Sequence, residues 1–431
     1  MSFLPISIND LQVGLYIKLD HGWSEHPFLR NTFTIRSGKD IAIIRKIGLT
    51  QITYDPARSD PKALESLAAS AQAATQGDPE EDVSVSEAEV EEAEKALAVE
   101  KEYLYEKLFS HQDAIEETAK AYQDALIQNK TAMQMISQGK AEGVEYANQV
   151  LESMMEVLNG PAPTLSLVKA STPKGITEEV SAHAMNVCSL SLLLGDTLGL
   201  NPEDRQALGQ GAMFHNIGLH RVPPAVRKKK KDALSNHERL QLETYPYYGR
   251  QMVEGLAGMS RGSLDIISQH QENLDGTGYP QGLKGDQIAF LPRVVRVVTE
   301  YNFLLNNGHG IATPTQALTY LYTKMKEQCQ PDIIDAFIAT VTVYPPGSFV
   351  RLSDDSVGLV VKTHKSERLC PLVVLYETTQ DSGDLVIVNL ATQRDLTIKE
   401  SLNPKDLDPK ILAQLQQSLG GGGLTGYFVS A

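Results

Sequence analysis

Histidine and carboxylate side chains that could bind a metal ion are concentrated in three short stretches of the sequence. In the first, Glu179 and His183 are four residues apart, so on a helix they lie on the same face. A Glu–His pair at this spacing can hold a metal from one helix, although an exposed surface pair has the same pattern. In the second, His215 ends an apolar run just before Gly218, which is also typical of a histidine at the edge of a core.

The third stretch, HQENLDGTGYP, occupies residues 270–280 and is the most distinctive. His270 is followed by a glutamate, an aspartate and a glycine-rich turn, which resembles half of a metal-dependent hydrolase site. Gly278 and Pro280 favour a turn, and Tyr279 would present a rigid amphipathic surface of the kind that interfaces favour. The simpler alternative is a turn that connects two helices and only packs.

Taken together, these stretches resemble the HD-GYP family, metal-dependent phosphodiesterases that hydrolyse cyclic di-GMP. The residues that carry the resemblance are His183 with Asn186–Val187, His215–Asn216–Ile217–Gly218, and HQENLDGTGYPQGLKGDQI at 270–288. The resemblance spans roughly residues 165–340 and implies an all-α HD-type domain. Residues 14–29 resemble the small N-terminal domain of unassigned function that precedes this family's catalytic domain, and the chain from Tyr344 resembles the C-terminal extension of the same subgroup.

The resemblance places the family's metal ligands on residues of this chain. They are Glu179, His183, His215 and His270, with Asn216 as a weak addition. Imidazole and carboxylate groups suit Fe and Mn, so the resemblance implies a divalent transition metal, with one ion at most. Buried histidines paired with Glu179 would also be satisfied as a hydrogen-bonded polar core, so a metal-free cluster is an equal alternative.

Five positions depart from the family's pattern. They are Asn216 in place of Asp, Leu219 in place of Lys, Tyr245 in place of His, Gln271 in place of His and Thr299 in place of Asp. A centre of two or three metals needs carboxylates that bridge and neutralise closely spaced cations. Amide, hydroxyl and phenol groups are weak ligands for transition metals. The basic residues with which the family binds substrate phosphates are also absent from NNGHGIA at 306–312.

These departures predict a degenerate signalling protein of the cyclic di-GMP network, catalytically impaired and acting by binding proteins or nucleotide. The family's turn is implicated in contacts with GGDEF-type diguanylate cyclases, so such a cyclase and cyclic di-GMP are the expected partners. The binding residues here are Asp275, Gly276, Gly278, Tyr279, Pro280 and Lys284. One alternative is a metal-dependent cyclic di-GMP phosphodiesterase with a reduced metal site, aided by the basic run 227–231. The other is a structural or dimerising module built on residues 87–158.

The segments that precede these residues differ in pattern. Residues 1–56 alternate apolar and polar side chains and predict a small β-rich unit, with strands at 14–20 and 33–44. Residues 57–95, rich in Ala, Ser, Glu and Gln, predict a flexible acidic linker. Apolar residues at steps of three to four predict a long helical segment over 87–158, which would permit a homodimer.

Residues 165–340 alternate helical runs with polar loops and show no convincing strand, so an all-α domain is predicted. Residues 344–419 predict a small β-rich C-terminal unit of the barrel or sandwich type, and 420–431 a flexible tail. Its strands are expected at 358–364, 372–377 and 385–390. The expected fold class is therefore multidomain and mainly α, with an HD-type helical domain between two small β-rich units.

Composition argues against several classes of protein. The 431 residues carry a formal net charge of −15, which argues against a binder of nucleic-acid polymers. Cys188, Cys329 and Cys370 are too few and too scattered for a disulfide framework or a thiolate zinc site, and a reduced cytoplasmic location is expected. No apolar stretch approaches the roughly 18 residues of a membrane span, and the N-terminus lacks a signal-peptide pattern.

Overall fold

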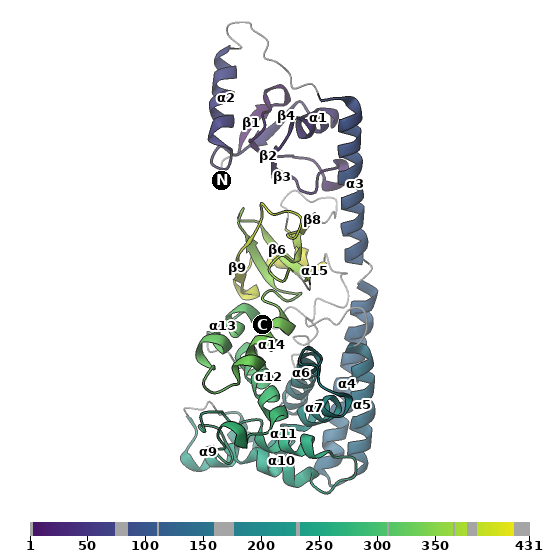
Figure 1. Cartoon of the computed structure of the whole chain (residues 1–431), viewed down its shortest axis with the longest axis vertical. Helices are drawn as coiled ribbons and strands as arrows, with labels where there is room; N and C mark the ends of the chain where they lie inside the picture. Colours follow the sequence, from purple (N-terminus) through teal and green to yellow (C-terminus); the bar gives the residue numbers. More distant parts are fainter. Residues whose placement is uncertain are drawn as a thin grey trace. The chain divides into compact units, whose positions relative to one another are not determined.

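The computed structural model describes residues 3–73, 85–109, 112–158, 176–229, 233–307, 310–364, 367–376 and 386–417. The chain divides into two compact units, and its elements are labelled in Figure 1. One unit comprises residues 1–110, 356–358 and 372–396, and the other comprises 111–355, 359–371 and 397–431. The helical domain lies wholly in the second unit, whereas the division between the units falls within the C-terminal sheet.

The first unit contains a four-stranded antiparallel sheet with strand order β1-β4-β2-β3 (Figure 1). Its elements are β1 (Leu4–Ser7), β2 (Tyr16–Lys18), β3 (Thr32–Thr34), α1 (Gly38–Lys46), β4 (Gln51–Tyr54), α2 (Pro61–Ala73) and α3 (Glu87–Phe109). Side chains alternate between the two faces of a strand, and Ile6, Ile17, Ile52 and Phe33 bury one face in a common core. The predicted β-rich N-terminal sheet is confirmed.

Helix α1 occupies a segment for which a strand was predicted. The helix begins at Gly38 because Ser37 and Asp40 cap it reciprocally. Ser37 Oγ accepts from the Asp40 N–H at 3.4 Å, and the Asp40 carboxylate accepts from the Ser37 N–H at 3.1 Å. Such a capping box satisfies amides that the start of a helix leaves without partners. The isoleucines that suggested strand alternation instead lie on α1, where Ile43 and Ile44 are buried.

Replacing Ser37 by alanine should destabilise the first turn of α1 by about 1 kcal/mol, because one amide loses its acceptor. We expect roughly five-fold faster amide hydrogen exchange across Gly38–Lys46, measured by mass spectrometry. Thr131→Ala is the matched control, since this exposed hydroxyl only donates to the Ile127 carbonyl within its own helix. Unchanged exchange in Ser37→Ala would show that the cap contributes nothing.

The predicted flexible linker over residues 57–95 is corrected in part, because residues Pro61–Ala73 form α2. Helix α3 begins at Glu87, where the long helical segment was predicted to begin. Proline at the first helical position is compatible with a helix start because its missing N–H would have no partner there. Residues 74–84 lie outside the described part of the chain.

The predicted long helical segment over 87–158 consists of separate helices. After α3, the chain forms α4 (Gln112–Ser137) and α5 (Glu142–Leu158). Gly139 has a φ of 80° in the turn between α4 and α5, a conformation that glycine adopts without strain. Gly143 allows the two helices to approach closely, because a Cβ there would lie 2.9 Å from the Ala132 carbonyl oxygen.

The helical domain follows, and between residues 176 and 341 none of the described residues forms a strand. Its helices are α6 (Ile176–Thr197), α7 (Pro202–Phe214), α8 (Pro224–Arg227), α9 (Asn236–Glu243), α10 (Tyr245–Val253), α11 (Arg261–Gln269), α12 (Phe290–Asn307), α13 (Pro314–Lys324) and α14 (Pro331–Val341). Two short 3-10 helices also occur, η4 (Ile217–Arg221) and η6 (Gly285–Gln287). Residues of α4 and α5 share the core of this domain, which includes the fully buried Phe214 and Phe337. The predicted all-α domain is confirmed.

The C-terminal sheet is antiparallel, with strand order β8-β7-β6-β5-β9. Its elements are β5 (Phe349–Leu352), β6 (Val357–Lys362), β7 (Leu372–Leu375), β8 (Val386–Asn389), β9 (Ile398–Leu402) and α15 (Pro409–Gln417). All three predicted strands have counterparts, whereas β9 and α15 were not predicted. The strand order ends at β8 and β9, so the predicted barrel is not confirmed. The predicted flexible tail at 420–431 lies outside the described residues.

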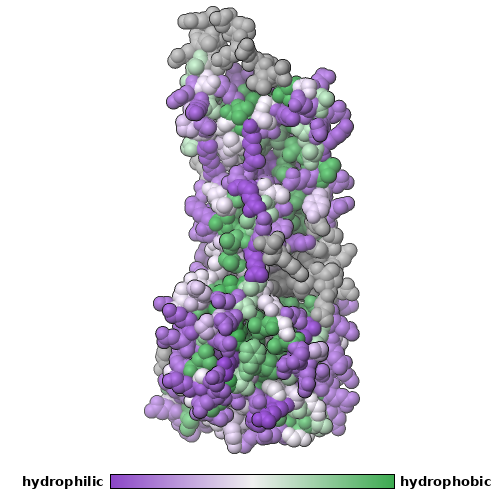
Figure 2. Space-filling view, in the orientation of Figure 1, coloured by the Kyte–Doolittle hydropathy of each residue, from purple (hydrophilic) through white to green (hydrophobic). Residues whose placement is uncertain are grey.

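On the face shown in Figure 2, hydrophobic residues gather near the middle of the lower part, with polar residues around them. Among the described residues, no helix is both long enough and apolar enough to cross a membrane.

Candidate metal and nucleotide site

Three helices of the second unit bring the predicted histidines together. His183 lies within α6, His215 directly follows α7, and His270 directly follows α11. The centres of the His183 and His215 rings are 5.2 Å apart, and those of His215 and His270 are 4.9 Å apart. His215 and His270 are buried, and His183 is half-buried. Glu179 lies on α6 four residues before His183, but its side chain is outside the described residues.

Each histidine donates through Nδ1, which leaves Nε2 with a lone pair. His215 donates to the Ala212 carbonyl at 2.7 Å, and His270 donates to the carbonyls of Ile266 and Ile267, each at 3.1 Å. A carbonyl oxygen only accepts, so both Nδ1 atoms must carry the proton. His183 Nδ1 lies 2.6 Å from Asn302 Oδ1, which acts as acceptor in the same way. Such partners orient histidine rings for metal binding.

The three rings are neutral at neutral pH. Burial lowers the pKa of His183 and of His270, the latter to about 3. Burial also lowers the pKa of His215, together with repulsion from His270 and His183. Desolvation disfavours the imidazolium form, and a neutral imidazole is the form that binds a metal.

Two buried polar atoms of this cluster have no hydrogen-bond partner. They are His215 Nε2 and Asn216 Oδ1, whereas Asn216 Nδ2 donates to the Val180 carbonyl at 2.8 Å. Unpaired buried acceptors are uncommon and often indicate a bound ion or water. The hydrogen bond to Val180 orients the Asn216 side chain through Nδ2 and leaves Oδ1 buried without a partner.

The Tyr245 hydroxyl is hydrogen-bonded to Nε2 of His270, the atom through which this histidine would bind a metal. Its hydroxyl lies 2.7 Å from His270 Nε2 and also accepts from Gln271 Nε2 at 3.0 Å. Burial raises the pKa of Tyr245 well above its usual range, so the group is a phenol rather than a phenolate. Because the phenol proton points at the lone pair of His270, that lone pair is not available to a metal.

The carboxylate that the family has on α12 has no replacement here. Thr299 Oγ1 donates to the Val295 carbonyl of its own helix at 2.7 Å. The neighbouring Glu300 pairs with Arg296 at 2.7 Å, as expected for a residue about 100° further round the helix. Arg296 also donates to Asn273 Oδ1 at 2.9 Å. It thereby connects α12 to the turn that begins after His270.

Arg296 and Asn302 were not identified from the sequence. Both are buried polar residues of α12, and a buried polar residue requires a partner. Because α12 also carries the polar residues Arg293, Thr299 and Glu300, the sequence pattern does not single them out. Leu219, at the family's lysine position, packs instead beside Val222, Val226 and Tyr245.

Hydrogen bonds from main-chain N–H groups to the buried Glu272 side chain hold the turn with the GYP sequence. The Glu272 carboxylate accepts from the N–H groups of Gln281 at 2.7 Å and Leu283 at 2.9 Å. A Cβ on Gly278 would collide with the backbone of Glu272 and its neighbours, so only glycine fits. Tyr279, which was expected to present a surface, is half-buried, with its ring centre 6.3 Å from that of Tyr245.

The remaining residues predicted to bind a partner lie around this turn. Asp275 accepts from the Thr277 N–H at 2.9 Å and from its hydroxyl at 2.6 Å. Gly276 has a φ of 84°. Pro280 is half-buried and Lys284 is exposed. The turn therefore has a fixed shape and an accessible outer side.

Replacing Glu272 by glutamine should loosen the turn by about 1.5 kcal/mol, because charge-assisted bonds to two amides are weakened. We expect roughly ten-fold faster hydrogen exchange at the amides of Gln281 and Leu283. Asp286→Asn is the matched control, because this solvent-exposed carboxylate only pairs with Arg293 at 3.1 Å. Equal exchange in both variants would mean that Glu272 does not hold the turn.

Comparisons with known proteins find two family models that match successive segments of the chain. A family model described as HD domain matches residues 165–333, and a model for a domain of unknown function, DUF3391, matches residues 4–147. The chain is 27% identical over 384 residues to cyclic di-GMP phosphodiesterase PA4108 of Pseudomonas aeruginosa, across 86% of this chain and 84% of the relative. The chain therefore has an HD domain preceded by a DUF3391 domain, and its relatives are of the HD-GYP type.

Two further relatives match about half of the chain. It is 24% identical over 231 residues to cyclic di-GMP phosphodiesterase PdeB of Borreliella burgdorferi, across 52% of this chain and 60% of the relative. It is 28% identical over 203 residues to cyclic di-GMP phosphodiesterase response regulator RpfG of Xanthomonas campestris pv. campestris, across 46% of this chain and 53% of the relative. The chain thus spans less than two thirds of the length of either relative.

The described side chains of the helical domain fit a centre of two or three metals poorly. Among them, no group of three or more histidine, cysteine, aspartate or glutamate residues is arranged to hold a metal ion. The atoms that remain are the Nε2 lone pairs of His183 and His215 and the Asn216 oxygen, with the Glu179 side chain outside the described set.

Proposed function

We propose that this chain is a catalytically impaired HD-GYP protein of the cyclic di-GMP signalling network that acts by binding. The observation that supports this best is the hydrogen bond between the Tyr245 hydroxyl and His270 Nε2. In a hydrolytic centre, that nitrogen would be a metal ligand. Here His270 Nε2 accepts a hydrogen bond from the Tyr245 hydroxyl, which stays protonated at neutral pH. Tyr245 therefore occupies the position at which a metal ion would bind this nitrogen.

The loss of bridging carboxylates leads to the same conclusion. A nucleophilic hydroxide held between two metals requires both ions to be close together. Asn216 is neutral, and Thr299 has its hydroxyl turned to its own helix. With neither carboxylate present, two divalent ions would repel each other without compensation.

One ion remains compatible with the site. His183, His215 and Asn216 would hold it, with Glu179 as the anionic ligand, and Fe or Mn suits this set. Such an ion would supply Lewis-acid polarisation of a bound phosphate. The protein's own contribution is to hold the two rings neutral and oriented through Asn302 and the Ala212 carbonyl.

The relatives are named as cyclic di-GMP phosphodiesterases, which supports cyclic di-GMP as the ligand of this chain. We propose the turn of Asp275–Pro280, with exposed Lys284 beside it, as the surface for a GGDEF-type cyclase domain. Its rigid backbone limits the entropy lost on binding. The homodimer remains a prediction.

An alternative function is that of a phosphodiesterase working with one metal. The two unpaired buried acceptors, His215 Nε2 and Asn216 Oδ1, favour it because they are free to bind a cation. The basic run 227–231 contributes little support, because Lys229 pairs with Glu238 at 2.6 Å and residues 230–231 are outside the described set.

The deciding experiment measures metal content, cyclic di-GMP binding and cyclic di-GMP hydrolysis on one preparation purified without chelator. Hydrolysis is followed with added Mn²⁺ or Fe²⁺, and His215→Ala serves as the metal-site control. We expect one ion per chain or fewer, measurable nucleotide binding and no turnover above that of His215→Ala. Two ions per chain with turnover that His215→Ala abolishes would establish the alternative.

A further inference from the structure

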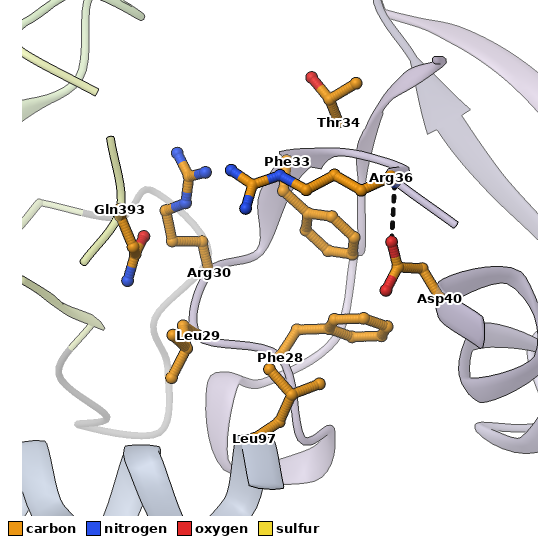
Figure 3. Close-up of a pocket in the computed structure, with 9 residues that line it drawn as sticks. All are labelled: Phe28, Leu29, Arg30, Phe33, Thr34, Arg36, Asp40, Leu97 and Gln393. Atoms are coloured by element: carbon orange, nitrogen blue, oxygen red, sulfur yellow. Dashed lines mark hydrogen bonds between the residues drawn. The ribbon is translucent and has the colours of Figure 1, made fainter. Parts of the chain in front are cut away.

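We propose that the first unit has a nucleobase-binding site of its own, formed by the segment around β3, helix α3 and the loop after β8. The site is a cavity of about 120 Å³ (Figure 3). A ~150 Å³ apolar cavity admits a benzene ring, so this slightly smaller cavity has room for one ring of a base, and the second ring of a purine would lie at its open side. All lining residues belong to the first unit.

Gln393 is the observation that points to a ligand. Its side chain is only 7% exposed, and neither its amide oxygen nor its amide nitrogen has a hydrogen-bond partner. A buried carboxamide with both atoms unpaired is strongly unfavourable. It presents one acceptor and one donor side by side. The edge of a nucleobase presents the complementary pair, as in the two-bond contact between glutamine and adenine.

The opposite wall of the cavity is flat and apolar. Phe28 and Phe33 are stacked with ring centres 4.5 Å apart and planes inclined at 30°, and Figure 3 shows them across from Gln393. Leu97 of α3 lines the same side. Aromatic side chains stack on any nucleobase, so this wall supplies the surface against which a base would lie.

The charges at the cavity favour an uncharged ring inside and an anionic group outside. Arg30 and Arg36 both pair with Asp395, at 2.5 Å and 2.7 Å. Asp40 is engaged by the Arg36 N–H at 2.7 Å. The two arginines and the two aspartates carry equal and opposite charge, so the lining of the cavity has no net charge that a bound ion would neutralise. The Arg36 side chain is 63% exposed, and its guanidinium can meet the phosphate of a nucleotide at the surface.

Isothermal titration calorimetry of the full chain tests the site with AMP, GMP and cyclic di-GMP, and with ribose 5-phosphate as the probe that lacks a base. We expect at least one nucleotide to bind at least about ten-fold more tightly than ribose 5-phosphate. Gln393→Leu and, as a second variant, Gln393→Glu should each lose about 10- to 100-fold in affinity. Gln51→Leu, at an exposed glutamine of β4, should bind as the unaltered chain does.

The same titrations separate this site from the helical one. Binding that persists in both Gln393 variants but is lost in His215→Ala belongs to the histidine cluster, and it would overturn the inference while leaving the proposed function intact. Absence of nucleotide binding, or equal binding of ribose 5-phosphate, would also overturn it. Binding that is lost in the Gln393 variants and retained in His215→Ala is the expected result.

Discussion

A protein carrying Asn216→Asp alone should hydrolyse cyclic di-GMP no faster than the unaltered chain. The aspartate would restore one bridging carboxylate, but Tyr245 would still occupy His270 Nε2 and Thr299 would still offer no carboxylate. A second ion would therefore remain unbound, and the nucleophilic hydroxide depends on two. Release of the linear dinucleotide product, followed by chromatography with added Mn²⁺, measures the rate.

Restoring the four ligand positions together should have the largest effect of any change. The combination is Asn216→Asp, Tyr245→His, Gln271→His and Thr299→Asp. We expect at least a roughly 100-fold gain in hydrolysis over the single variant, because loss of even a supporting group at a metal site commonly costs 10- to 100-fold. The same combination with His183→Ala is the inactive control. A clear gain from Asn216→Asp alone would contradict the impaired site.

Replacing Tyr245 by phenylalanine should destabilise the helical domain by about 1–3 kcal/mol, because His270 Nε2 becomes a buried acceptor without a partner. Urea unfolding followed by circular dichroism measures this loss. Tyr247→Phe is the matched control, since its exposed hydroxyl only accepts from Gln251 Nε2 at 2.8 Å, and it should change stability by less than about 0.5 kcal/mol.

A second measurement on the Tyr245→Phe variant, its stabilisation by added Mn²⁺, shows whether Tyr245 blocks a metal ligand or only packs against His270. Freeing His270 Nε2 should make added Mn²⁺ stabilise the variant more than it stabilises the unaltered chain, since binding to the folded state alone raises its stability. Identical Mn²⁺ effects in both proteins would mean that Tyr245 does not block a ligand atom.

Local features of this protein could be predicted from the sequence alone. The GYP turn follows from Gly278, whose lack of a side chain is required by a close approach of backbone, and the helical domain follows from apolar residues at helical spacing. The departures from the family's pattern are single residues at fixed spacings from the motifs. The strand predicted over 33–44 ends at Thr34 in β3, and α1 follows it because a capping box outweighed alternation. That signal was present in the sequence as Ser37 and Asp40.

The tertiary structure decided how distant residues meet. The sequence identifies Tyr245 as a substitution, but only the packing of α10 against α11 places its hydroxyl on His270. The sequence likewise contains Gln393, but only the folding of the first unit buries its amide beside Phe28 and Phe33. Residue type and spacing determine local conformation and the chemistry available. Which groups are paired, blocked or left without a partner depends on contacts between remote segments, and these form only when the chain packs.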